Sequence, residues 1–105
     1  MSEKPEEEEI EDNKSYTLPD KALWDHVAKL AIVDDKPIMM DYWTDSFDNK
    51  ALIGVRDSGE KLLVKNAEEY TSPIAKIYKV ETAFIICTEN SIYLTSSNIA
   101  TRKIS

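Results

Sequence analysis

The sequence predicts a mainly β fold with one N-terminal α-helix, in which about five or six short strands form a small antiparallel β-barrel or roll. Three observations favour this class. Apolar residues with helical spacing occur early in the chain, apolar and polar residues alternate after Pro37, and only short turns separate the alternating segments. A helix lying across an antiparallel sheet, an α+β layer, is the near alternative. We expect residues 15–105 to form a single domain, since ~90 residues can bury one core without disulfides.

An acidic arm precedes this domain and covers residues 1–14. Residues 1–13 contain seven acids and one base, a net charge of −6, whereas the whole 105-residue chain carries −7. Because like charges repel and Ile10 is the arm's one large apolar residue, we expect this arm to be disordered and flexible in isolation. It is either a solubilising tail or a docking peptide for a basic surface. In the second case the candidate electrostatic contacts are Glu6, Glu7, Glu8 and Glu9.

The helix is predicted over residues 18–32. Thr17 and Asp20 form a capping box, and Pro19 is tolerated in a first turn that needs no internal donor. One face carries the apolar residues Leu23, Trp24, Val27, Leu30 and Ala31. We expect this helix to cap an open end of the barrel and to bury Trp24 there.

After Pro37 the apolar residues recur at every second position, which predicts strands. We expect them at residues 38–44, 51–56, 61–65, 74–80, 82–88 and 91–95. Gly54 indicates a bulge or a close backbone approach within its strand. Residues 66–73 are expected to be a loop with one helical turn at 67–70. Residues 82–88 are apolar on both faces, which is typical of a central strand. Residues 96–105 form either an edge strand or a loose tail.

The residue types that carry catalysis or bind metals are few and scattered. Cys87 lies in the most apolar strand, where desolvation disfavours a thiolate, and His26 is the single histidine. One cysteine and one histidine are too few for a zinc site, and Asp41, Asp45 and Asp48 lack the spacing of a calcium loop. The two glycines fit no phosphate-binding motif. We therefore expect no enzyme activity, no cofactor and no metal.

Binding to a protein partner, or a structural role in an assembly, is the function that remains. Met39, Trp43, Phe47 and Tyr70 are the candidate partner contacts, because methionine and aromatic side chains are favoured at interfaces. An exposed edge strand would allow a partner to add a strand of its own.

A nucleic-acid-associated accessory domain is the alternative. It would act on single strands, where tyrosines stack on bases beside lysines, or on a basic nucleic-acid-binding partner. Direct binding is disfavoured because the chain beyond the arm is nearly neutral. It gains support if five bases converge on one face with Tyr78 or Tyr93: Lys61, Lys65, Lys76, Lys79 and Arg102.

The expected location is intracellular, in the cytoplasm or nucleus, or inside a virus particle. No apolar stretch resembles a secretion signal or approaches the ~20 residues that cross a bilayer, and the lone cysteine cannot form an internal disulfide. We therefore expect neither secretion nor membrane insertion.

Two segments, residues 69–74 and 88–94, resemble stretches in small, mostly uncharacterised proteins of large DNA viruses. The resemblance implies a component of a virus particle, and it carries no motif from which a functional residue could be assigned. The order of a helix followed by strands is similar to that of Sm-like proteins, although their RNA-binding signature is lacking.

Overall fold

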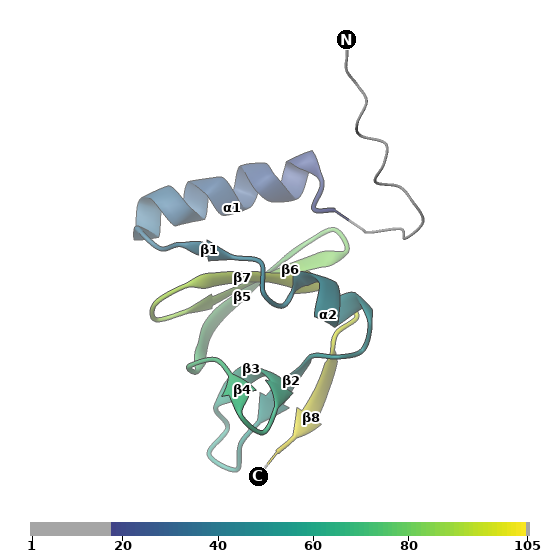
Figure 1. Ribbon diagram of the computed structural model, residues 1–105. Coiled ribbons are helices and arrows are strands. Elements are labelled where there is room, and N and C mark those ends of the chain that lie inside the picture. Colours follow the sequence, from purple (N-terminus) through teal and green to yellow (C-terminus); the bar gives the residue numbers. More distant parts are fainter. Residues whose placement is uncertain (1–17, 105) are drawn as a thin grey trace.

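A computed structural model describes residues 18–104, which form two stacked four-stranded sheets with a helix lying on the upper one (Figure 1). The expected acidic arm, including Glu6–Glu9, lies outside the described residues. So does Thr17, the predicted helix cap. Neither described helix has the length and apolar character needed to cross a membrane.

Helix α1 (Lys21–Asp34) begins three residues later than predicted. Its N-cap is Asp20, whose Oδ1 accepts a hydrogen bond of 3.0 Å from the Leu23 amide, so Pro19 precedes the helix. The helix ends at Asp34, and its C-cap, Asp35, adopts a left-handed conformation with φ of 54°. The side chains that α1 buries are Leu23 and Val27. The expected burial of Trp24 is wrong, because its side chain is 39% exposed. The helix lies along a sheet rather than over the end of a barrel (Figure 1).

The upper sheet has the strand order β1-β7-β6-β5. Its strands are β1 (Ile38–Met39), β5 (Ile74–Val80), β6 (Ala83–Thr88) and β7 (Ile92–Ser96). The central position predicted for residues 82–88 is confirmed, since β6 pairs with β5 on one side and β7 on the other. A first core fills the space between α1 and this sheet, with Val27, Ile85, Cys87 and Leu94 among its buried residues.

The strand predicted over residues 38–44 is wrong beyond Met39. The chain turns there and forms the short helix α2 (Trp43–Phe47). The Ser46 Oγ donates to the Trp43 carbonyl at 2.7 Å and accepts from the Ser96 amide at 2.8 Å, which ties this helix to β7. Tertiary contacts thus override an alternation that, by itself, is typical of a strand.

The lower sheet has the order β4-β3-β2-β8. Its strands are β2 (Leu52–Val55), β3 (Lys61–Asn66), β4 (Glu69–Tyr70) and β8 (Ala100–Lys103). The helical turn predicted at residues 67–70 is wrong, because Glu69 and Tyr70 pair with β3 across a tight turn in which Asn66 Oδ1 accepts from the Glu68 amide. The edge-strand alternative for the C-terminal segment is confirmed by β8, which pairs with β2.

The mainly β character is confirmed, whereas a closed antiparallel barrel is not observed. The sheets are open and mixed, because β1 runs parallel to β7 and β8 runs parallel to β2. A second core joins them and contains Ile53 and Leu63 of the lower sheet and Ile86 of the upper one. Two sheets that pack face to face bury these side chains without closing into a barrel. The upper half, in which α1 lies on a sheet, is nearer to the alternative prediction of a helix across a sheet.

Candidate functional site

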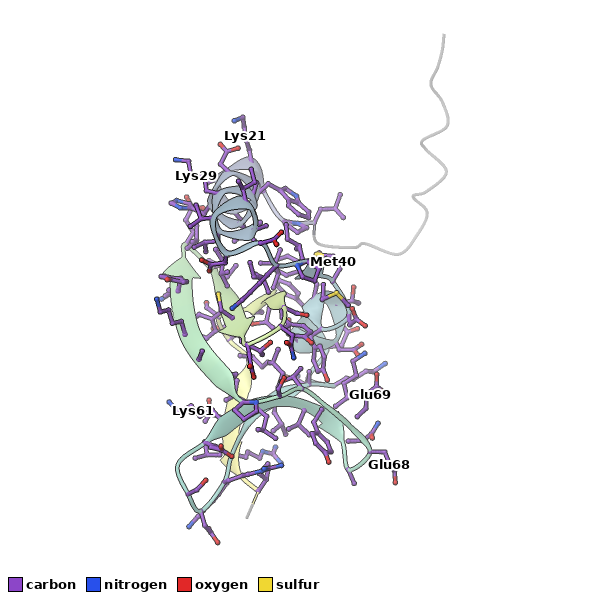
Figure 2. The ribbon with its side chains drawn as sticks, turned by 90° about the vertical axis from the view of Figure 1, so that its left-hand side faces the viewer. Lys21, Lys29, Met40, Lys61, Glu68 and Glu69 are labelled. Atoms are coloured by element: carbon purple, nitrogen blue, oxygen red, sulfur yellow. The ribbon has the colours of Figure 1, made fainter. Side chains whose placement is uncertain are left out.

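A groove on the outer face of the lower sheet has a volume of about 780 Å³. We call it the β-face groove. In the side view the lower sheet curves, and its concave face turns away from the upper sheet (Figure 2). The apolar lining comes from β2, β3, β4 and the segments beside them: Leu52, Leu62, Val64, Ala67, Tyr70 and Ile104.

Strand alternation places these side chains on the outer face. Ile53 and Leu63 pair in register and point into the core between the sheets. Their neighbours along the strands, Leu52, Leu62 and Val64, therefore point to the opposite face. The lower sheet thus has two apolar faces, of which only one packs against the upper sheet.

Gly54 allows the floor of the groove to form. A Cβ atom at this position would lie 2.7 Å from Ile104 Cδ1 and 3.1 Å from Val64 Cγ2. The close approach expected at Gly54 is confirmed, since the missing side chain leaves room for Ile104 to lie across the sheet. Ile104 remains 41% exposed and Tyr70 53% exposed, whereas Leu62 beside them is buried.

A charged cluster lies at the boundary between the groove and α2. Lys65 Nζ lies 3.3 Å from Asp45 Oδ2, 3.6 Å from Glu69 Oε2 and 4.9 Å from the centre of the Tyr42 ring. Burial alone would lower the pKa of Lys65, but its hydrogen bond to Asp45 and the charges of both carboxylates raise it above the ordinary value. Burial, reinforced by the charge of Glu69, raises the pKa of Tyr42 to about 12. Lys65 thus bridges Asp45 of α2 and Glu69 of β4, so the cluster links β3, β4 and α2.

The free edge of β8 borders the same face. Within the described part of the chain, β8 pairs only with β2, and its four residues are exposed. The opposite edge of β8 therefore presents unpaired backbone donors and acceptors. Arg102, in register with Gly54, forms no ion pair with any residue from 18 to 104.

The four predicted partner contacts do not form one surface. Tyr70 lines the β-face groove, whereas Met39 is half-buried in β1. Trp43 is only 5% exposed, so its side chain belongs to the core; Phe47 is exposed and packs edge-on against it with ring centres 4.8 Å apart. Sequence reasoning missed Leu52, Leu62, Val64 and Ile104. The signal was present in β2 and β3, whose residues are apolar at successive positions and so on both faces.

The five bases that would favour nucleic-acid binding are divided between the sheets. Lys76 and Lys79 lie on β5 with Tyr78, whereas Lys61 and Arg102 lie on the lower sheet. Lys65 is already engaged by Asp45 and Glu69. This division gives direct nucleic-acid binding less support than protein binding.

The residues considered for catalysis or metal binding are not assembled into a site. Cys87 is buried in the core beneath α1, and burial raises the pKa of its thiol. His26 instead lines an open groove between α1 and β5, to which Cys87 does not contribute. Between residues 18 and 104 no group of three or more histidine, cysteine or acidic side chains is arranged to hold a metal ion.

Comparisons with known proteins return no match: no family, no curated protein and no solved structure is similar to this chain.

Proposed function

We propose that this protein is a non-enzymatic interaction module whose β-face groove receives an extended segment of a partner protein. The observation that carries the proposal is the second apolar face of the lower sheet. Soluble chains bury most such surface, and a contiguous apolar hollow with a polar rim is typical of an interaction site.

The free edge of β8 supports a specific mode of binding. A partner segment that adds a strand beside β8 gains main-chain hydrogen bonds, and its alternate side chains lie on the same face of the sheet as the groove. Those side chains would be apolar, to match Leu52 and Ile104. A carboxylate elsewhere on the segment would complement Arg102, whose charge is uncompensated among the described residues. The same mode would serve in a larger assembly such as a virus particle, where the segment belongs to a neighbouring subunit.

Selection of short random peptides displayed on phage, with the full-length chain immobilised, tests this proposal. We expect enrichment of peptides with apolar residues at alternate positions. The affinity of one such peptide should fall at least tenfold for Ile104→Asp, since the charge is placed in the groove. Ile32→Asp is the matched control, because Ile32 is exposed on α1, away from the groove.

Two outcomes would overturn the proposal. One is the absence of alternating apolar peptides among those enriched. The other is an affinity that Ile104→Asp and Ile32→Asp reduce equally. A labelled single-stranded oligonucleotide serves as the probe for the alternative function. Tight binding that weakens steeply as salt is added would favour nucleic-acid recognition instead.

A further inference from the structure

A second, smaller groove runs between α1 and β5, on the upper sheet and away from the β-face groove. We call it the α1–β5 groove; its volume is about 300 Å³. His26, Lys29 and Leu30 line it from the helix, and Tyr78, Lys79 and Val80 line it from the strand. Ile85 of β6 also lines it. The lining of the groove therefore includes apolar side chains and two lysines.

The positive charge of this groove is not neutralised by the part of the chain that the structure describes. Lys29 and Lys79 form no ion pair with residues 18–104. Neither does Lys76, which lies two residues before Tyr78 on β5. The nearest acid on the helix, Asp25, is held by Lys21 at 3.1 Å. Glu81, which follows β5, lines the adjoining cavity rather than this groove. The groove therefore favours a ligand that carries negative charge.

An acidic segment of this same chain is attached next to the groove. Leu18, the first described residue, lines the adjoining cavity together with Val80, and Val80 lines both cavities. Seventeen residues precede Leu18, with acids concentrated at Glu6–Glu9, Glu11 and Asp12. From the N-cap Asp20 to Lys29 the helix advances by nine residue steps and rises ~14 Å, a distance that ~4–5 extended residues span. The arm is thus long enough for its acids to reach Lys29 and Lys79.

The pattern of the arm also matches the groove. Ile10 is its one large apolar residue, and acids stand on both sides of it, at Glu9 and Glu11. The groove likewise combines apolar residues, Leu30 and Val80, with the lysines Lys29 and Lys79. We propose that the α1–β5 groove binds the chain's own acidic arm, residues 3–12, with Ile10 against its floor.

This contact would shield an exposed edge. Strand β5 is the edge of the upper sheet opposite β1, and Ile77 and Tyr78 on it are exposed. Unprotected edge strands pair with other chains, and charged cover is a usual protection. Each surface ion pair is weak, but tethering raises the local concentration of the arm, so the contact forms at low salt and is released at high salt. The inference is independent of the β-face groove.

Paramagnetic NMR on the full-length chain tests this inference. A spin label is attached through Glu8→Cys, and it reacts selectively because Cys87 is buried. At low salt we expect the amide signals of Lys29 and Tyr78 to lose most of their intensity. Those of Ser58 and Gly59, in the β2–β3 turn of the lower sheet, should keep theirs. The double reversal Lys29→Glu with Lys79→Glu should restore the lost signals.

The matched control is Lys50→Glu with Lys61→Glu, which changes the net charge equally at exposed lysines outside the groove. Restoration by both double variants, or signal loss spread evenly over the surface, would overturn the assignment. A mixture of spin-labelled chain and isotope-labelled, spin-free chain identifies the source of the arm. Signal loss in that mixture would show that a second copy supplies it, which contradicts binding within one chain.

Discussion

Lys65 and Asp45 join two parts of the fold that are distant in the sequence: the lysine Nζ on β3 lies 3.3 Å from the carboxylate Oδ2 on α2. The lysine side chain is 20% exposed and the aspartate 29%. A partly buried pair of this kind is screened less by solvent than the pairs on the surface.

The Lys65–Asp45 pair should contribute measurably to stability. In a double-mutant cycle with Lys65→Met and Asp45→Asn, we expect a coupling energy of about 1 kcal/mol, measured by urea unfolding. The matched control is Lys21–Asp25, a pair within α1 whose side chains are 88% and 63% exposed. Its coupling should stay below ~0.5 kcal/mol. Equal coupling energies for the two pairs would contradict the structural role of Lys65.

Alkaline pH should destabilise the fold through Tyr42. Burial is the main reason that its pKa is raised, from 10.0 in the unfolded chain to about 12 in the fold. Because the unfolded chain releases this proton first, the stability is fully present below pH 10 and is lost as the pH rises towards 12. The loss is on the order of 2–3 kcal/mol. The raised pKa of Lys65 acts in the same direction.

Tyr42→Phe isolates this effect, because it keeps the aromatic ring and removes the hydroxyl group that titrates. The free energy of unfolding of the variant, measured in urea across the same pH range, should fall less steeply than that of the wild type. Parallel curves for the two proteins would show that Tyr42 is not responsible.

Gly54 and Ile104 should be energetically coupled. Gly54→Ala places a Cβ 2.7 Å from Ile104 Cδ1 and 3.0 Å from its Cγ2, so we expect a destabilisation of about 1–3 kcal/mol. In an Ile104→Ala background these two atoms are absent, and most of that cost should disappear. Thermal or urea unfolding of the four proteins measures the coupling.

Gly59→Ala is the control for the Gly54 experiment. A Cβ at Gly59 meets nothing within 4 Å, but its φ of +94° strains any other residue, at a cost of about 1 kcal/mol or more. That cost should be the same in the wild-type and Ile104→Ala backgrounds. If Ile104→Ala relieves both glycine substitutions alike, the contact across the groove floor is not the cause.

Ser46→Ala should loosen the attachment of α2 to β7. The hydroxyl accepts from the buried Ser96 amide at 2.8 Å, and its removal leaves this donor without its partner. We expect a loss of about 1–3 kcal/mol, with faster hydrogen exchange at the Ser96 amide. Ser58→Ala, at an exposed turn, should change stability by less than ~0.5 kcal/mol. An unchanged exchange rate at Ser96 would argue against this bond.

Much of the strand content was predictable, because alternation is a local property. Residues 51–56, 61–65, 74–80, 82–88 and 91–95 were each expected to be strands, and each contains one. The segment at residues 40–47 was not predictable in this way. Its alternation is typical of a strand, yet Ser46 gains two buried hydrogen bonds only as part of α2, one of them to a residue 50 positions away.

The candidate site was less predictable than the fold. Of the expected contacts only Tyr70 lines the β-face groove, since exposure depends on which sheet covers which face. Trp43 illustrates the difficulty: its size and position in a short segment favour an interface, but the space between α1 and the upper sheet buries it.

Outside residues 40–47, the amino-acid sequence by itself determined the period of the main segments, and so the approximate position of α1, the central place of β6 and the two apolar faces of β2 and β3. Only the tertiary structure decided that β1 pairs in parallel with β7, and that β8 pairs in parallel with β2. Both are edge strands, and the sheets stay open. The reason is physical. Periodicity assigns side chains to faces within a few residues, whereas strand partners are selected by packing between residues far apart in the chain.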